Sequence, residues 1–397
     1  MNTAPTKQEL LSRIERFITL MSAKHPDWDT AIIINKVNQY YFTGTMQDAL
    51  LIIKRSGELA YFIRRSLERA KIDSPLDCLF PMESYKDVVE KVGAPCGNTY
   101  LELEVVPVSM LERMKKHLKF ENIASLDRTI LQLRAVKSPY ELHFMKESGA
   151  QHKILLEEII PSILKEGMTE ADLIAETFEK MYKLGFQGLS RFGMFQTEML
   201  VGQIGFGANS LIPSNFDGPG GAIGLSAATP FGGSRERRLQ KGDLVFADIA
   251  YGVNGYHSDK TQVYSFGAMP TQTIASAHAT CLQIQAALAS QLVPGKIPAL
   301  IYDEIINKYS DIANFMGFGT RQAKFFGHGV GLVIDEHPVI AYGFNSPLEE
   351  NMVLALEPKI GIANIGMVGV EDTYIVTPNG GQCITGGGRE IITLISS

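Results

Sequence analysis

The sequence predicts an α+β protein of two domains, an α/β domain over residues 1–130 and a second domain over residues 138–397. The chain has 397 residues, of which 45% are hydrophobic and 20% charged, so it is long enough for two hydrophobic cores. Strand-like runs mix with helix-like segments before residue 130, whereas later strand-like runs are separated by glycine turns. Between the two parts, Ser138-Pro139 opens a new helix, because proline is favoured in a first helical turn.

The first domain begins with an amphipathic helix over residues 7–24, where apolar side chains recur at helical spacing. Apolar runs and helical spacing predict its other elements: strands at 31–34, 50–53, 59–63 and 99–103, and helices at 109–118 and 127–137. This part of the chain contains neither a phosphate-binding loop nor a nucleophile elbow.

The second domain combines helices with short strands around a glycine-rich segment at 202–233. Its predicted elements are helices at 139–165, 169–184, 270–292 and 298–309, and strands at 325–333, 352–356 and 368–376. Glycine lets backbone approach a ligand closely, so the segment at 202–233 is a candidate wall of a binding site.

Charge and hydropathy exclude several classes of partner. The net charge is −6, the pI is about 5.8, and lysine and arginine are scattered, so we expect no nucleic acid partner. No apolar run approaches the roughly 18 residues of a membrane span, and the polar N-terminus does not resemble a signal peptide. Four widely spaced cysteines fit free buried thiols. We therefore expect a cytoplasmic protein without a membrane partner.

Two aspartates lie in a predicted β-hairpin. An apolar strand leads through Asp248 to a glycine-flanked turn at 252–255 and back through Asp259. With the turn centred between Val253 and Asn254, Asp248 lies directly opposite Asp259, with Cβ atoms about 4.5–5.5 Å apart. Two buried carboxylates at this separation are costly unless they share a proton or a cation. The hairpin therefore predicts a metal site.

Five polar residues interrupt or end strand-like runs in the C-terminal half. They are Asp248, Asp259, His328, Glu357 and Glu371. Any one of them alone fits a surface residue or a hydrogen-bonded core residue. Together, four carboxylates and an imidazole suit Mn²⁺, Co²⁺, Fe²⁺ or Zn²⁺, and the total negative charge favours two ions.

A second hairpin is predicted from symmetry. Glu357 and Glu371 are equally distant from Asn364, which lies in a segment containing glycine and asparagine. The two glutamates can therefore face each other across this hairpin.

The order and setting of these residues resemble a known family. His328 lies in GHGVGL, Glu357 ends NMVLALE before a proline, and Glu371 begins EDTYIVT. This pattern is similar to the creatinase, prolidase, aminopeptidase P and methionine aminopeptidase family, which has the "pita-bread" fold. Residues 41–44 and 133–141 look like the prolidase-type N-terminal domain and its junction, so the resemblance covers nearly the whole chain.

The resemblance implies a dinuclear metal centre, with manganese favoured over cobalt, zinc or iron. Asp248 would chelate one metal, Asp259 and Glu371 would bridge both, and His328 with Glu357 would complete the other. It implies hydrolysis of an amide or peptide bond, often one preceding proline, by a hydroxide that bridges the metals. Glu357 would relay the proton to the leaving group. The substrate would be a small molecule or a short peptide, and the family's habit is a homodimer.

Three positions depart from the peptidase pattern. Phe231 and Asp335 stand where the peptidases have histidines, and Gly369 stands where they have arginine. Those histidines are thought to hold and protonate the substrate, so their loss removes hydrogen-bond donors that act in the transition state. We expect His257 and His337 to supply substitute catalytic imidazoles, and Phe231 and Asp335 to line the substrate pocket.

These departures leave two alternatives open. The same metal scaffold occurs in creatinase, in ectoine hydrolase and in a lyase acting on dimethylsulfoniopropionate, so the substrate could be a small non-peptide molecule. Histone-chaperone domains with this fold are binding modules without catalysis. They have generally lost the metal ligands, so the complete set of ligands in this chain argues against a binding module.

Overall fold

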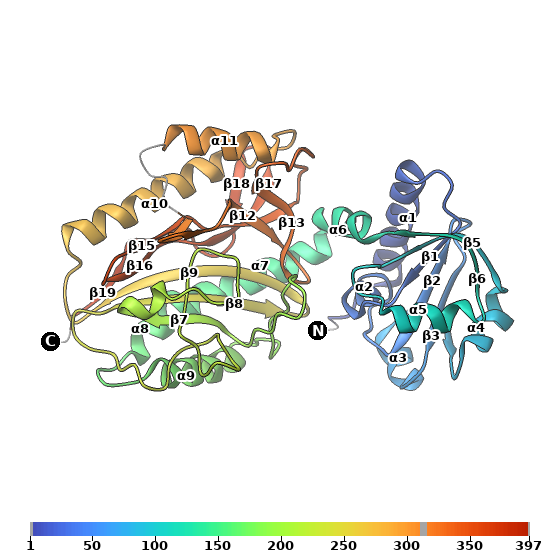
Figure 1. Ribbon diagram of the computed structural model, residues 1–397, viewed down its shortest axis with the longest axis horizontal. Coiled ribbons are helices and arrows are strands. Elements are labelled where there is room, and N and C mark those ends of the chain that lie inside the picture. Colours follow the sequence, from blue (N-terminus) through green and yellow to red (C-terminus); the bar gives the residue numbers. More distant parts are fainter. Residues whose placement is uncertain (1–2, 310–315, 396–397) are drawn as a thin grey trace. The chain divides into compact units, whose positions relative to one another are not determined.

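The computed structural model describes residues 3–309 and 316–395 and forms two compact units, Met1–Arg134 and Ala135–Ser397 (Figure 1). The boundary after Arg134 lies between the predicted domain limits at residues 130 and 138. All five predicted metal ligands belong to the Ala135–Ser397 unit.

The Met1–Arg134 unit contains a six-stranded mixed sheet in the order β4-β3-β2-β1-β5-β6. Its strands are β1 (Thr30–Ile33), β2 (Ala49–Lys54), β3 (Leu59–Ile63), β4 (Leu79–Pro81), β5 (Pro95–Leu101) and β6 (Lys119–Ser125). Its helices are α1 (Lys7–Lys24), α2 (Lys36–Thr43), α3 (Leu67–Asp73), α4 (Tyr85–Val92), α5 (Val108–Lys115) and α6 (Asp127–Ala135). Val88 of α4 and Met114 of α5 pack in one core with Phe62 of β3. The predicted helix over residues 7–24 is confirmed, whereas α2 was not predicted from its short, aromatic-rich segment.

Some helices of the Ala135–Ser397 unit begin at clear capping signals. The helices of this unit are α7 (Pro139–Ile154), α8 (Ile160–Ile163), α9 (Glu170–Lys183), α10 (Gln272–Ser290) and α11 (Pro298–Lys308). Ser138 and Thr169 each form a capping box, with Glu141 and Asp172 respectively, which satisfies backbone donors at the starts of α7 and α9. The predicted helix over 139–165 is interrupted by a π-helical turn at Leu155–Ile159.

Three sheets form the rest of this unit. The first, β19-β9-β8-β7, contains β7 (Gly202–Phe206), β8 (Leu244–Val253), β9 (Tyr256–Phe266) and β19 (Ile392–Leu394). The second, β13-β12-β14-β17-β18, contains β12 (Phe325–Val330), β13 (Ile334–Ala341), β14 (Val353–Leu356), β17 (Asp372–Thr377) and β18 (Gly380–Cys383). The third, β11-β10-β15-β16, contains β10 (Met316–Phe318), β11 (Arg321–Gln322), β15 (Lys359–Ile362) and β16 (Gly366–Gly369).

The strands lie between two helical layers. In Figure 1, α10 and α11 lie on one side of the strands of this unit, and α8 and α9 lie on the other. Val245 and Ala247 of β8 pack in the core that includes residues of α8 and α9. Because strand side chains alternate, Phe246 and Asp248 point to the opposite face, where Phe246 packs with Val368 of β16. Asp248 therefore faces the inside of the unit, between the sheets.

The first hairpin exists, but its predicted register is wrong. Val253 pairs with Tyr256, so the loop contains only Asn254 and Gly255, with φ angles of 50° and 93°. Positive φ at both positions is typical of the Asn-Gly turns that match the twist of paired strands. Asp248 is therefore opposite Thr261 rather than Asp259, while Ala250 is opposite Asp259. A shift of two residues preserves the face of a strand, so both aspartates still point to the same side.

The second hairpin is confirmed with the predicted register. Lys359 pairs with Gly369 in β15 and β16, and Leu356 pairs with Asp372 in β14 and β17. The same register places Glu357 opposite Glu371, in the gap between these two strand pairs. The turn contains Asn364 at a φ of 62°, a conformation that asparagine tolerates better than most residues.

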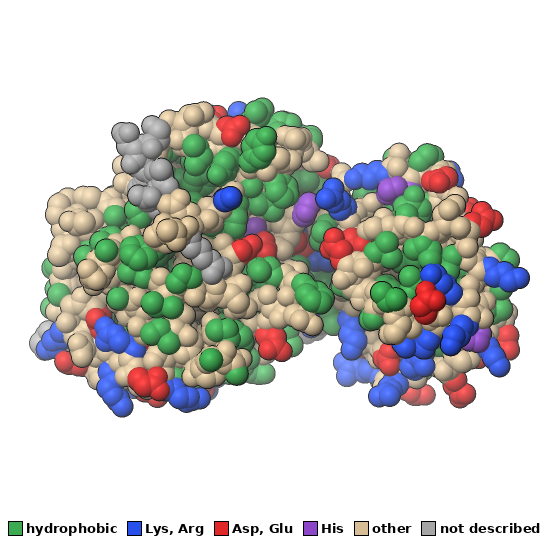
Figure 2. Space-filling view, viewed as in Figure 1, with side chains coloured by type: hydrophobic (Ala, Val, Ile, Leu, Met, Phe, Trp, Pro, Cys, Tyr) green, Lys and Arg blue, Asp and Glu red, His purple; other side chains and the backbone are tan. Residues whose placement is uncertain are grey.

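The surface and the cysteines agree with the composition. Basic and acidic side chains are interspersed on the face shown in Figure 2. Among the described residues, no helix has both the length and the hydrophobicity that crossing a membrane requires. The four cysteines are all free, as predicted, but only Cys96 and Cys281 are buried, while Cys78 and Cys383 are partly exposed.

Candidate metal centre

The predicted ligands meet in one pocket, with a cavity of about 40 Å³. A buried water needs roughly 10–15 Å³ by the same measure, so the cavity has room for an ion and one or two waters. The pocket is lined by Phe192, Met199, Gly202, Gln203, Phe216, Asp217, Gly218, Asp248, Ala250, Asp259, His328, Glu357 and Glu371. All five residues predicted from the sequence as ligands are among them.

Three of these residues form a compact set of ligand atoms. Asp259 of β9, His328 of β12 and Glu371 between β16 and β17 each offer one atom, and these atoms all lie within 4.8 Å of one another. All three side chains are buried, so water competes poorly for them. Two carboxylates and an imidazole suit a divalent transition metal, and this set fits a single such ion.

The imidazole of His328 is oriented for ligation by its other nitrogen. Its Nδ1 lies 3.1 Å from the carbonyl oxygen of Gly329 and donates a hydrogen bond to it in the neutral tautomer. Its Nε2 lies 3.5 Å from Glu357 Oε1, 3.7 Å from Glu371 Oε1 and 4.0 Å from Asp259 Oδ2. Backbone carbonyls commonly orient metal-binding histidines in this way.

A lysine that sequence reasoning did not identify lies among the carboxylates. The Nζ atom of Lys359 is 3.0 Å from Asp248 Oδ2, 2.9 Å from Glu357 Oε2 and 2.7 Å from Glu371 Oε2. The Lys359 side chain is fully buried, and an uncompensated charge there would be very unfavourable. The available signal in the sequence was a lysine directly after Glu357-Pro358, in a strand of otherwise small or apolar residues.

Each of the two glutamates, Glu357 and Glu371, directs one carboxylate oxygen to His328 and the other to Lys359. Oε1 of Glu357 and Oε1 of Glu371 face His328, whereas Oε2 of each contacts the Lys359 ammonium. Thr261, opposite Asp248 in the hairpin, donates a further hydrogen bond of 3.0 Å to Glu371 Oε2. The pocket thus has one cation position beside His328 and a second that holds the ammonium.

Burial and mutual repulsion raise the pKa values of three carboxyls. Burial raises the pKa of Asp248 to about 6 and that of Glu357 to about 8, although the Lys359 ammonium opposes both shifts. Burial, then the charges of Glu371 and Asp248, raise the pKa of Asp259 well above its usual value. Glu357 therefore carries a proton near neutral pH until a cation displaces it, whereas Asp248 does so only below about pH 6.

The remaining pair shifts in the opposite sense. Burial alone would raise the pKa of Glu371, but Lys359 and His328 lower it below its usual value. Burial alone would lower the pKa of His328, but its hydrogen bond to Glu371 and the charge of Glu357 raise it well above the usual value. Glu371 is therefore the carboxylate of the set that keeps its negative charge most firmly.

Residues outside the pocket fix the backbone around the ligands Asp259 and Glu371. The Thr373 hydroxyl accepts a hydrogen bond of 2.8 Å from the Asp259 N–H and donates one of 2.9 Å to the Asp259 carbonyl. Lys260 and Asp372, next in sequence to the ligands Asp259 and Glu371, form a buried ion pair at 2.7 Å. Strand alternation places this pair on the face away from the pocket, where it ties β9 to β17.

His257 is buried and engaged through both ring nitrogens. Its Nδ1 lies 3.0 Å from the Gly331 carbonyl oxygen, and its Nε2 lies 3.2 Å from the Arg191 N–H and 3.0 Å from Gln187 Nε2. It does not line the pocket described above. These contacts hold the hairpin end against neighbouring loops, and a catalytic role for His257 stays a prediction.

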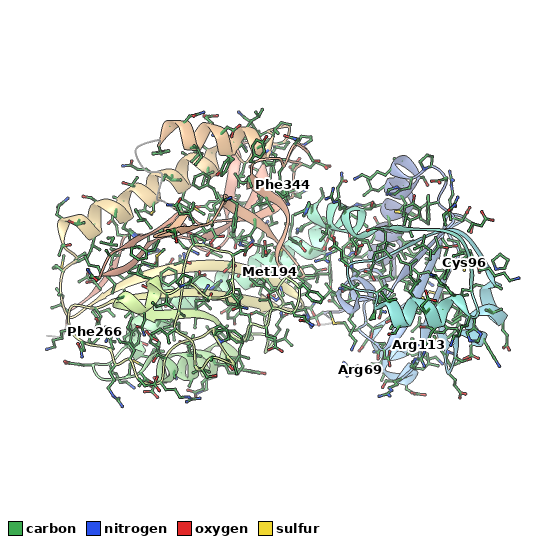
Figure 3. The ribbon with its side chains drawn as sticks, viewed as in Figure 1. Arg69, Cys96, Arg113, Met194, Phe266 and Phe344 are labelled. Atoms are coloured by element: carbon green, nitrogen blue, oxygen red, sulfur yellow. The ribbon has the colours of Figure 1, made fainter. Side chains whose placement is uncertain are left out.

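The other predicted site residues lie outside the pocket lining. The ring of His337 packs edge-on against Phe344 at 5.5 Å between centroids; Phe344 is labelled in Figure 3. The ring of Phe231 packs against that of Phe216, a lining residue, at 6.3 Å between ring centroids. Asp335 has a φ of 65°, and burial raises the pKa of its carboxyl. Roles for His337, Phe231 and Asp335 in substrate binding or catalysis stay predictions.

The apolar lining of the pocket comes from Phe192, Met199 and Phe216. Phe216 lies in the glycine-rich segment 202–233 that was expected to border a binding site. Phe192 and Met199 lie in the loop before β7, where neither periodicity nor a motif marks them, and sequence reasoning missed them.

Comparison with known proteins matches both units. Residues 143–378, more than half of the chain, match the family described as "Metallopeptidase family M24". Residues 13–136 match the family described as "Creatinase/Prolidase N-terminal domain". The chain belongs to metallopeptidase family M24. It is therefore a metallohydrolase, with the creatinase-type N-terminal domain and the pita-bread catalytic domain that the sequence predicted.

Individual relatives cover nearly the whole chain. An Xaa-Pro dipeptidase of Pyrococcus horikoshii is 28% identical over 92% of this chain and 94% of its own length. An uncharacterized peptidase of Staphylococcus epidermidis is 26% identical over 90% of this chain and 95% of its own. The solved structure of an Xaa-Pro dipeptidase from Bacillus anthracis has a TM-score of 0.79 at 20% identity, covering 97% of this chain and 100% of that one. The last comparison shows the shared fold.

Proposed function

We propose that this M24 member is a divalent-metal-dependent peptidase that hydrolyses Xaa-Pro bonds in short peptides. The observation that carries the proposal is the buried Asp259, His328 and Glu371 set at the base of a pocket. Relatives that carry the name Xaa-Pro dipeptidase and align over more than nine tenths of the chain support this substrate class. We propose manganese as the loading metal.

The residues around the pocket suit amide hydrolysis. A divalent metal bound by this set would polarise the scissile carbonyl and acidify a water near neutral pH. Glu357, whose pKa burial raises to about 8, lies beside the ligand set and can accept a proton and then release it. Its Oε1 faces the Asp259, His328 and Glu371 set, which is where a transferred proton would be needed.

The apolar lining of the pocket suits a proline-like ring. Phe192, Met199 and Phe216 line the same pocket as the carboxylates, so an apolar substrate group and a polar scissile bond can be bound together. The cavity itself accommodates only an ion and water, and the peptide would approach from its open side.

An assay on dipeptides tests the proposal. The chelator-stripped protein is reloaded with Mn²⁺ and offered Xaa-Pro dipeptides and matched Xaa-Ala dipeptides. We expect metal-dependent release of proline, abolished by chelator and by Glu371→Gln, and slower cleavage of the Xaa-Ala set. Absence of cleavage of every Xaa-Pro peptide by protein shown to contain metal would contradict the proposal.

The small non-peptide substrate considered from the sequence is not favoured by the comparisons, because the relatives described above are peptidases by name. The homodimeric state and the cytoplasmic location stay predictions.

A further inference from the structure

The Lys359 ammonium lies inside the ligand set rather than beside it. We infer that this ammonium permanently takes the second cation position, so the site binds one divalent ion and not two. The inference rests on the proposed metal-dependent function, since it concerns the number of ions at the same site.

The first support is the saturation of the ammonium. A lysine has three N–H donors, and Nζ lies 2.7–3.0 Å from one oxygen on each of three carboxylates, those of Asp248, Glu357 and Glu371. These are the distances of charge-assisted hydrogen bonds. Asp248, the residue expected to chelate one of the two metals, therefore already has its Oδ2 atom paired with a cation.

The second support is confinement of the lysine. Its backbone is paired with Gly369 in the β15–β16 ladder, and its side chain is fully buried. The ring of Phe246 lies 5.9 Å from Nζ. Withdrawing the ammonium would remove the positive charge that three buried carboxylates share, which is strongly unfavourable unless another cation replaces it at once.

The third support is that the other half of the site is left intact. Lys359 contacts only the Oε2 atoms of the two glutamates, while their Oε1 atoms face His328. The Asp259, His328 and Glu371 atoms within 4.8 Å of one another are therefore still available to a single ion. The ammonium and that ion would share Glu357 and Glu371 as common bridging anions.

Counting bound metal tests the inference. Wild-type protein and variants are stripped with chelator, dialysed against excess Mn²⁺, freed of unbound metal and analysed by mass spectrometry of the metal and by titration calorimetry. We expect one equivalent in the wild type and close to two in Lys359→Ala, which removes the ammonium and opens its space. Electron paramagnetic resonance should change from an isolated Mn²⁺ signal in the wild type to a spin-coupled pair in Lys359→Ala.

Two further variants separate charge from volume and from general damage. Lys359→Met fills the same space without a charge, so we expect it to block the second ion and to bind no more than one equivalent. Lys137→Met breaks another buried ion pair, with Glu336 at 2.9 Å, and Lys137 does not line the metal pocket. We expect Lys137→Met to lose thermal stability and still bind one equivalent.

The outcomes distinguish this inference from the proposed function. Two equivalents in the wild type overturn the inference but not the proposed function. One equivalent in a folded Lys359→Ala variant likewise overturns the inference but not the proposed function. If Lys359→Ala does not fold, the wild-type count alone decides. No bound metal in the wild type overturns the inference and the proposed function together. One equivalent without cleavage of Xaa-Pro peptides supports the inference and contradicts only the proposed function.

Discussion

Asp259 reaches the cation position from β9 and Glu371 from the link between β16 and β17, and each is held by its neighbours. Asp259 is fixed through its backbone by Thr373, while the Glu371 carboxylate accepts hydrogen bonds from Thr261 and Lys359. Such support keeps ligand atoms in place before the metal arrives, which lowers the cost of binding.

Removing one ligand should abolish metal binding without unfolding the protein. Asp259→Asn keeps the size of the side chain but removes an anionic ligand, so we expect Mn²⁺ affinity and hydrolysis to fall by on the order of 100-fold or more. Asp217→Asn is the matched control, because Asp217 lines the pocket without belonging to the three-ligand set. For each variant, titration calorimetry measures the Mn²⁺ affinity and the dipeptide assay measures hydrolysis. An Asp259→Asn variant with wild-type affinity would show that the assigned site is wrong.

Metal affinity should rise with pH between about 6 and 8. Burial raises the pKa of Glu357, which lies beside the ligand set, to about 8, and it raises the pKa of the ligand Asp259 well above its usual value. Glu357 therefore carries a proton below about pH 8 in the absence of metal. A bound ion must displace such protons, and each proton released can change the affinity by up to about tenfold per pH unit. Calorimetry in buffers of different ionisation enthalpy counts the protons. Glu357→Gln should give a shallower dependence, and a flat wild-type profile over this range would contradict the assignment.

At the scale of single elements, the β15–β16 hairpin explains one departure from the family pattern. Gly369 has a φ of 134°, and a Cβ atom there would lie 2.4 Å from the Pro358 carbonyl oxygen and 2.5 Å from Lys359 Cα. The arginine that the resemblance led us to expect at 369 therefore does not fit this backbone. The positive charge instead comes from Lys359, directly opposite on the paired strand.

Gly369→Ala should be markedly destabilising. Its backbone conformation and the close atoms act together, so we expect the free energy of unfolding to fall by roughly 2–4 kcal/mol. Gly242 has a φ of 94°, but a Cβ atom there would meet no described atom within 4 Å, so Gly242→Ala should cost only about 1 kcal/mol. Urea unfolding of both variants gives the comparison. Equal losses would mean that crowding at Gly369 contributes nothing.

At the scale of the whole molecule, the two units should respond differently to metal. All the candidate ligands lie in Ala135–Ser397, and none lies in Met1–Arg134 among the described residues. An ion that binds only folded protein stabilises the unit that holds it, by about 2.7 kcal/mol at a hundredfold excess over Kd.

Calorimetric unfolding in chelator and in Mn²⁺ should therefore show a selective effect. We expect the transition of Ala135–Ser397 to move to higher temperature with Mn²⁺ and that of Met1–Arg134 to stay within about 1 °C. Asp259→Asn supplies the control, since its transitions should not move. A shift of the Met1–Arg134 transition alone would place the metal elsewhere.

The sequence by itself determined which residues could be ligands and which faces they occupy. Polar residues inside apolar runs marked Asp248, Asp259, His328, Glu357 and Glu371, because burial of such groups requires a partner. Strand alternation put both aspartates on one side, and symmetry about Asn364 predicted the pairing of the glutamates. These features follow from the periodicity of side chains along a strand, which can be read directly from the sequence.

Only the tertiary structure decided what meets in the pocket. The register of the β8–β9 hairpin is set by the two-residue Asn254-Gly255 turn. The predicted register differs from the observed one by only two residues, so the sequence pattern did not distinguish them. The contact between Lys359 and Asp248 joins residues 111 positions apart on different sheets. No periodicity within a strand specifies how sheets are packed, because that depends on the summed burial of many side chains. Whether the second cation position holds a metal or an ammonium was therefore a property of the packing, not of the motif.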